Sequence, residues 1–221
     1  MSGIQMMLLG TAATNISYVA FSSATAVGSA GTAVTVPTGT LDTDLMVICL
    51  ASESGGTFVV PSGFTTLVDV TMQVGQDQMA MYYKLGSVPT STVTVYGNGT
   101  LSDTGALIAT FRGVSAHNAF GYQTYASTNN DTTLARTSPS VASGLGQLQL
   151  FMLGKDTGAG TDTMTPSQGT KIAQVDAAFV PDETVVCLAA NLGSGSTTGT
   201  CLWSTSGTVG ASYGAATATF Y

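Results

Sequence analysis

The sequence predicts an all-β protein: an antiparallel, jelly-roll-like β-sandwich built from two similar halves, with a short N-terminal arm. Three observations lead to this prediction. Apolar runs of strand length alternate with clusters of Gly, Pro, Asn and Asp, no window shows a helical period, and one long pattern occurs twice. Spacings of roughly 10 to 15 residues between runs are typical of sandwiches and jelly rolls.

The repeated pattern has three matching parts in the same order. The apolar run Leu45–Ala51 matches Leu148–Gly154, and the turn at Pro61-Ser62 matches Pro166-Ser167. Each half closes on Ala-Thr-Phe, at residues 109–111 and 218–220. The offset grows from 103 residues (45 to 148) to 109 (109 to 218), so loops differ in length while the order is kept. A period this long indicates a duplicated β-unit and not a solenoid, whose repeats are shorter.

The individual strands follow from alternation and from continuous apolar runs. A continuous run such as 45–51 predicts a central strand buried on both faces, and alternation such as 78–84 predicts a strand with one buried face. In order, the expected strands are 32–37, 45–51, 64–70, 78–84, 92–96, 106–111, 148–153, 171–176, 184–190, 199–204 and 215–221. The similar halves span about 31–113 and 132–221, and residues 112–131 are expected to connect them. We favour one sandwich assembled from both halves over two independent sandwiches, because each half alone leaves open edges.

Residues 1–30 are expected to form an arm outside the sandwich. They begin with an apolar patch, followed by small residues; the patch consists of Ile4, Met6, Met7, Leu8 and Leu9. Two interpretations remain open, docking on the protein's own core or attachment to a neighbouring subunit. The first nine residues carry no Lys or Arg, so no signal peptide is predicted, and no run reaches the roughly 20 apolar residues of a membrane helix.

Charge is scarce and predominantly acidic. Charged residues make up 8% of the chain, the formal net charge is −7, and only five residues are Lys or Arg. A groove that binds nucleic acid directly needs a stripe of basic residues, so no such groove is expected. A chain this apolar and this poor in charge is expected to bury surface against other subunits as a homo-oligomer, for instance a trimer. The odd number of cysteines (Cys49, Cys187 and Cys201) indicates buried free thiols, with a Cys187–Cys201 bridge as the alternative.

No catalytic motif stands out, and no catalytic residue is predicted. The single histidine, His117, is expected to be a solvated loop residue, and the aspartates lie mostly at turn positions where Asp bonds its own backbone. No cofactor is predicted. Calcium is the best of the weak candidates, because oxygen ligands cluster at Asp42 and Asp44, at Asn129-Asn130-Asp131, and at Asp156 with Asp162.

Aromatic side chains offer the one candidate for ligand binding. Loop aromatics could stack on a host surface glycan, and the residues named for this role are Tyr122, Tyr125 and Trp203. Tyr82, Tyr83 and Tyr96 have the same chemistry. In a β-sandwich the commoner use of such a ring is core or cross-strand packing.

Several short motifs together resemble a β-sandwich module that recurs in virion proteins of tailed bacteriophages. They are Val36-Pro37-Thr38-Gly39, Asp44-Leu45, Pro61-Ser62-Gly63-Phe64, Tyr82-Tyr83-Lys84 and Phe111-Arg112-Gly113-Val114, and the opening Ile4-Gln5-Met6-Met7-Leu8-Leu9-Gly10 is similar to the start of small phage structural proteins. The resemblance covers about residues 30–221. It consists of turns and core positions and carries over no catalytic residue. In the second half Gln147 replaces Asp44.

The resemblance implies a non-enzymatic bacteriophage structural protein. It would be located in the virion as a capsid decoration or tail-associated subunit, and its partners would be other virion proteins, with the arm as the attachment segment. The alternative is a tail adhesin that binds a host glycan. A polysaccharide hydrolase is the third hypothesis, and it would need a pair of carboxylates flanking the scissile bond.

Overall fold

The protein is described from a computed structural model, which places residues 15–25, 31–53, 56–72, 77–89, 91–98, 102–125, 135–144, 146–158, 163–179, 182–192, 200–206 and 212–221. The secondary structure of these residues consists of strands, as the sequence predicts, and every strand pair is antiparallel. In this part of the chain no helix has the length and apolar character needed to cross a membrane.

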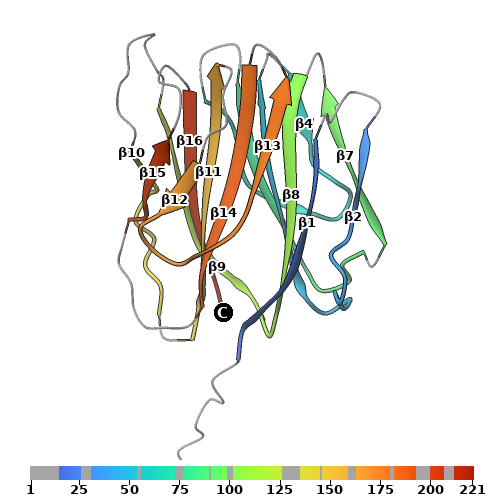
Figure 1. Cartoon of the computed structure of the whole chain (residues 1–221). Coiled ribbons are helices and arrows are strands. Elements are labelled where there is room, and N and C mark those ends of the chain that lie inside the picture. The colour runs from blue at the N-terminus through green and yellow to red at the C-terminus, as the bar shows by residue number, and fades with distance from the viewer. Residues whose placement is uncertain are drawn as a thin grey trace, which may run out of the picture.

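The described residues form sixteen strands, eight from each half. Figure 1 shows their arrangement. The first eight are β1 (Ser17–Thr25), β2 (Thr32–Thr35), β3 (Leu45–Glu53), β4 (Thr57–Val59), β5 (Thr65–Thr71), β6 (Gln78–Leu85), β7 (Thr92–Asn98) and β8 (Ser102–Arg112). The second eight are β9 (His117–Tyr125), β10 (Ala135–Thr137), β11 (Leu148–Gly158), β12 (Thr163–Pro166), β13 (Thr170–Phe179), β14 (Asp182–Leu192), β15 (Leu202–Ser206) and β16 (Ser212–Phe220).

The two halves have the same topology. The first half pairs its strands as β1-β8-β3-β6-β5 and β2-β7-β4, and the second pairs them as β9-β16-β11-β14-β13 and β10-β15-β12. Adding eight to each strand number of the first half therefore gives the second. In each half the chain passes between a large and a small sheet, and β5, which follows β4 of the small sheet, pairs with β6 in the large sheet. The duplication read from the sequence is confirmed.

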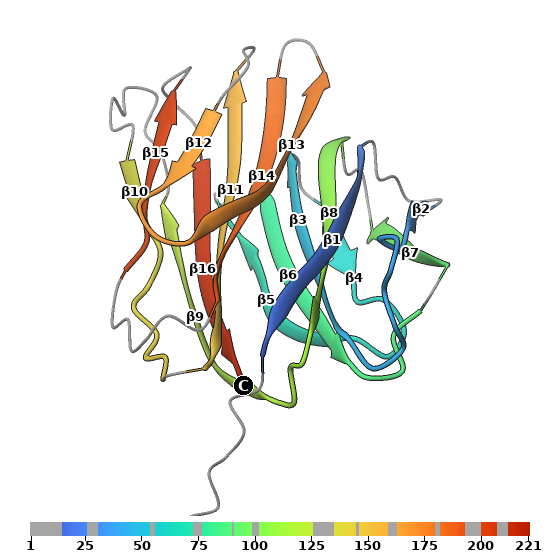
Figure 2. The same cartoon turned by 60° about the horizontal axis from the view of Figure 1, so that its bottom comes forward.

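Each half is a sandwich of its own, and the two sandwiches pack through their large sheets (Figures 1 and 2). The layers are thus a small sheet, two large sheets and a second small sheet. Met46, Ile48 and Leu50 of β3 point into the first sandwich, whereas Val47 and Cys49 point toward the other half. The two halves together enclose the core between the large sheets, and each half adds an inner core of its own, so the continuous apolar run of β3 faces two cores.

The contact between the halves is close and reciprocal. A Cβ atom added at Gly105 of β8 would lie 3.3 Å from Cγ1 of Val186 on β14. A Cβ atom added at the equivalent Gly214 of β16 would lie 2.8 Å from Sδ of Met79 on β6. Equivalent strands thus meet in both directions, as in the two-fold interface of a homodimer. The glycines allow the large sheets to approach at these points.

Two expected segment boundaries are wrong. Residues 17–25, assigned to the arm, form β1 at the edge of the first large sheet, and residues 117–125, assigned to the connector, form β9 at the equivalent edge of the second. Both are edge strands, paired on one side only within the described part of the chain. They carry few consecutive apolar residues because only part of their surface is buried, and a search for apolar runs therefore misses them. The apolar patch from Ile4 to Leu9 lies outside the described residues.

All three cysteines are buried free thiols, as the sequence indicates, and Cys187 is not bridged to Cys201. Burial raises the pKa of the Cys187 thiol to about 12 and also raises the pKa values of Cys49 and Cys201.

We expect the native protein to resist thiol reagents, because reaction requires an exposed thiolate. The measurement is the rate of reaction with a chromogenic disulfide, compared between native buffer and denaturant. All three thiols should react only after unfolding. Rapid reaction of a native thiol, or a chain lighter by two hydrogens in mass spectrometry, would contradict this arrangement.

Candidate functional site: an aromatic groove on the first sandwich

A groove opens on the outer side of the first sandwich, between β7 and the turn that joins β4 to β5. Its volume is about 290 Å³. Eight residues line it: Pro61, Ser62, Phe64, Pro89, Thr92, Val93, Thr94 and Tyr96. Two of them carry aromatic rings, three carry aliphatic hydroxyl groups, and none carries a carboxylate, amine, guanidinium or imidazole.

The shortness of β4 creates the groove. Within the described residues, β4 pairs with β7 only through Thr57 with Asn98, Phe58 with Gly97, and Val59 with Tyr96. The chain then leaves through Val60 and Pro61 toward β5 in the large sheet. The remaining stretch of β7, Thr92–Val95, is paired with β2 on its other side. Its β4 side is the place where the groove lies.

The turn beside the groove is fixed in shape by its own sequence. The Phe64 N–H donates to the Pro61 carbonyl at 3.0 Å, and Gly63 has a φ of +78°, which an L side chain rarely adopts. The Lys84 ammonium lies 5.9 Å from the centroid of the Phe64 ring. A Cβ atom added at Gly63 would come within 2.7 Å of Nζ of Lys84. The lysine of Tyr-Tyr-Lys thus packs against the Pro-Ser-Gly-Phe turn.

Tyr96 forms the exposed aromatic side of the groove. Its side chain is 42% exposed, and an edge of its ring lies against the backbone of Gly31, where an added Cβ would be 2.4 Å from Cε1. Directly across the strand pair stands Val59, which is also exposed. Only glycine at position 31 leaves room for the ring in this place.

The equivalent turn of the second sandwich is arranged differently. The Ser167 hydroxyl accepts a hydrogen bond from the Leu202 N–H at 2.8 Å, and the Ser167 N–H donates to the Leu202 carbonyl at 2.8 Å. The Gln168 side-chain amide donates to the Thr200 carbonyl at 3.1 Å. This turn is therefore hydrogen-bonded to β15 and the residues just before it, so the duplicated halves differ at the groove.

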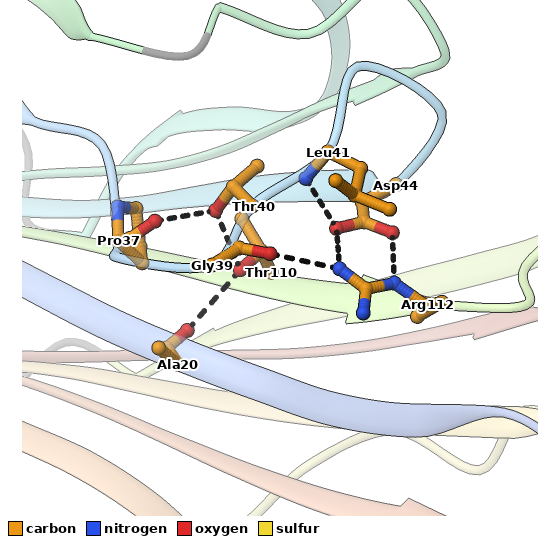
Figure 3. Close-up of polar contacts among 8 residues, drawn as sticks. All are labelled: Ala20, Pro37, Gly39, Thr40, Leu41, Asp44, Thr110 and Arg112. Atoms are coloured by element: carbon orange, nitrogen blue, oxygen red, sulfur yellow. Dashed lines mark hydrogen bonds and ion pairs between the residues drawn. The ribbon is translucent and has the colours of Figure 1, made fainter.

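A second polar site, around Asp44 and Arg112, is structural (Figure 3). Arg112 donates from Nε to Oδ1 and from Nη2 to Oδ2 of Asp44, both at 3.0 Å, and from Nη2 to the Gly39 carbonyl at 2.8 Å. The Leu41 N–H donates to Oδ2 of Asp44 at 2.8 Å. Both oxygens of this buried carboxylate are thus engaged, which fixes the loop before β3 onto the end of β8. The hydrogen bond to Asp44 also raises the pKa of Arg112.

The second half achieves the same turn without a charge. Gln147 occupies the position of Asp44, and its Oε1 accepts the Gly144 N–H at 2.7 Å, as Asp44 accepts that of Leu41. The amide therefore reproduces the turn but not the ion pair. Asp44, one of the oxygen ligands considered for calcium in the sequence, has both carboxylate oxygens engaged by Arg112 and the Leu41 N–H. Asp131 and Asp162 lie outside the described residues, and the described part of the chain holds no group of three or more metal-ligating side chains.

We expect Asp44→Ala to lower the melting temperature more than Asp44→Asn does. Alanine removes every acceptor from the loop, whereas asparagine keeps an oxygen for the Leu41 N–H, as Gln147 does for Gly144. Thermal unfolding followed by circular dichroism measures both variants. Equal melting temperatures for the wild type and Asp44→Ala would show that the ion pair does not stabilise the fold.

Other aspartates also have structural partners. The Tyr82 hydroxyl donates to Oδ2 of Asp69 at 2.8 Å, and the Ser212 hydroxyl donates to Oδ2 of Asp77 across the contact between the halves. Burial raises the pKa of Asp69, and the hydrogen bond from Tyr82 lowers it in part. These carboxylates serve the fold.

His117 is packed among aromatic rings and is not a solvated loop residue as expected. It lies at the start of β9, with its ring centroid 5.3 Å from that of Tyr83 on β6 and 5.3 Å from that of Phe220 on β16. Tyr83 belongs to the first half and Phe220 to the second, so the imidazole bridges the two sandwiches. Burial lowers its pKa. Tyr18 holds the equivalent position in the first half, opposite Phe111.

Protonation of His117 is therefore expected to destabilise the protein. A lowered pKa in the folded state means that the unfolded chain binds the proton more tightly, so the free energy of unfolding falls as the pH drops through about 6.5, the ordinary pKa of histidine. Chemical unfolding at a series of pH values from neutral to mildly acidic measures this. His117→Tyr, which inserts the residue of the equivalent position, should lose this component. An identical pH profile in both proteins would refute the effect.

The glycan-stacking residues predicted from the sequence do not come together in one site. Tyr122 lies on β9 and is 49% exposed, so its ring remains available. Tyr125 ends β9 opposite Tyr213, and its side chain lies outside the described part of the chain. Trp203 is fully buried in the second sandwich, where its indole N–H donates to the Ser138 hydroxyl at 2.9 Å. Its assignment to glycan stacking is corrected to core packing, because a buried ring presents no face to a ligand.

The sequence does contain a signal for the groove. Tyr96 alternates with the buried Val93 and Val95, which places it on the outer face of β7, and the turn motif before β5 marks the opposite wall. The strand pairing and the burial of side chains in the structure show that Tyr96 and this turn line the same groove. Comparison of the chain with known protein families, with curated proteins and with solved structures found no match.

Proposed function

We propose that the protein is a non-enzymatic structural subunit of a bacteriophage virion, displayed on the particle as a capsid decoration or tail-associated protein. The observation that carries this proposal is that the phage-like motifs form structural contacts of the sandwich. Pro61–Phe64 with Lys84 and Asp44 with Arg112 each form a contact that holds a loop or turn of the sandwich in place. The resemblance thus rests on residues that build the fold.

The edges of the large sheets support a role in assembly. Phe21 on β1 and Phe120 on β9 occupy equivalent positions, opposite Ala109 and Ala218 respectively, and both are about half exposed. Within the described residues both strands lie at a sheet edge, the position from which a strand can pair with another chain. Two equivalent apolar edges on one subunit provide two contact sites for neighbouring subunits.

The test uses purified full-length chain and particles assembled without it. Mass photometry gives the oligomeric state, and co-sedimentation with the particles gives occupancy. We expect a homo-oligomer that binds at a fixed stoichiometry. Phe21→Ser combined with Phe120→Ser should reduce oligomerisation or occupancy. Leu202→Ser, at a similarly exposed leucine on the small sheet, is the control and should retain both.

Two results would overturn the proposal. One is a monomer at micromolar concentration that does not bind particles. The other is unchanged assembly after both the removal of residues 1–9 and the double phenylalanine replacement. Binding to tail assemblies but not to capsids would assign the subunit to the tail.

A further inference from the structure

We propose that the groove between β7 and the β4–β5 turn binds a neutral saccharide of one or two sugar rings. This site is separate from the edge strands β1 and β9, so the inference does not depend on the assembly role. It differs from the sugar-binding residues expected from sequence, because its exposed ring is Tyr96 and not Tyr122, Tyr125 or Trp203.

The first argument is the preorganised ring. A sugar presents a face of C–H groups that packs on an aromatic surface. The Tyr96 ring is held against the Gly31 backbone on one edge and is otherwise exposed along the groove. Phe64, the second ring, is fixed by the turn it closes and by Lys84. Rings that are already in position lose little freedom when a ligand binds.

The second argument is the polar part of the lining. Ser62, Thr92 and Thr94 bring three hydroxyl groups to the same groove as the two rings. A hydroxyl both donates and accepts hydrogen bonds, so it can pair with sugar hydroxyls in either direction. Few polar groups within a largely apolar lining is the usual composition of a small-molecule site.

The third argument is charge. The only ionisable side chain among the eight lining residues is the phenol of Tyr96. The nearby Lys84 ammonium is placed over the Phe64 ring. The chain as a whole carries a formal charge of −7. Acidic sugars would meet repulsion from the negative chain, and no residue of the lining itself carries a positive charge. A neutral ligand fits this lining.

The shape of the groove distinguishes a sugar from an added peptide strand. The open side of Thr92–Val95 could pair with an extended peptide. An added strand would also need space in the groove for every second side chain of the peptide. Phe64 and the almost fully buried Val93 occupy that space. The volume of about 290 Å³ is at the small end of ligand sites, which suits one or two rings.

The experiment is saturation-transfer NMR on the full-length chain with a panel of neutral hexoses, N-acetylhexosamines, deoxyhexoses and their disaccharides at millimolar concentration. Titration then gives the dissociation constant of each hit. We expect at least one neutral sugar to bind. Tyr96→Ala should weaken its binding about tenfold or more, because the stacking surface is lost. Tyr221→Ala, which removes a tyrosine of nearly the same exposed fraction (43% against 42%) outside the groove, should leave the affinity unchanged.

Gly31→Ala provides an independent variant. It alters no lining residue but displaces the Tyr96 ring, so it should weaken binding while the circular dichroism spectrum remains that of the wild type. The proposal is overturned if no neutral sugar binds, or if Tyr96→Ala binds as tightly as the wild type. Saturable binding of extended peptides in the absence of sugar binding would overturn it in favour of strand addition.

Discussion

Trp203→Ala is expected to lower the free energy of unfolding by about 3–5 kcal/mol, the range for removing a buried large aromatic side chain. The indole is completely buried between the sheets of the second sandwich, where it packs with Phe151, Leu153 and Met164. Its truncation leaves a cavity and removes the donor to Ser138. Because Trp203 is the only tryptophan, circular dichroism, and not fluorescence, must follow the unfolding of the variant by denaturant.

The matched control is Tyr122→Ala. This side chain is 49% exposed at the edge of the second large sheet, so its removal should change stability by no more than about 0.5 kcal/mol. In the wild type, tryptophan emission should be shielded from acrylamide until the protein unfolds. An easily quenched tryptophan, or two variants of equal stability, would mean that Trp203 is not in the core.

Leu107→Ala is expected to cost about 2–5 kcal/mol and to shift a single unfolding transition of the whole chain. Leu107 lies on β8, fully buried in the core that the two large sheets share. That core takes residues from both halves, including Cys49 of β3 and Leu188 of β14. The two sandwiches should therefore unfold together although each has its own inner core.

Scanning calorimetry measures this directly, and Leu202→Ala is the control at an exposed leucine. We expect one transition in all three proteins, at a lower temperature only in Leu107→Ala. Two separate transitions in the wild type would show that the halves are thermodynamically independent, because a cooperative unit melts in one step.

The central strands could be predicted from the sequence because their pattern is local. Residues 45–51 form a continuous apolar run, and residues 148–153 form one interrupted only by Gln149; both lie within central strands buried on two faces, β3 and β11. The turns around Pro61 and Pro166 were likewise visible. The short strands β4, β10 and β12 were missed, since three or four residues give too little pattern to detect.

The candidate site was less accessible to sequence reasoning. Three aromatic residues were singled out by type, and the structure placed Trp203 inside the core and Tyr122 on an exposed edge. The polar connector around His117 predicts a loop residue, whereas the rings of Tyr83 and Phe220 pack against it from strands distant in sequence. The side of a strand that faces a second sheet is set by the strands with which it pairs, and these are distant in sequence.

The sequence by itself determined that this protein is all-β and that its halves are copies of one unit, and it favoured free thiols over a Cys187–Cys201 bridge. These properties depend on composition and on patterns within a few residues or on direct repetition. The tertiary structure alone decided that each copy closes its own sandwich, that β1 and β9 complete the large sheets, and that Tyr96 and Phe64 face one groove. Strand pairing and sheet packing join residues far apart in the chain, and such long-range contacts leave no local pattern.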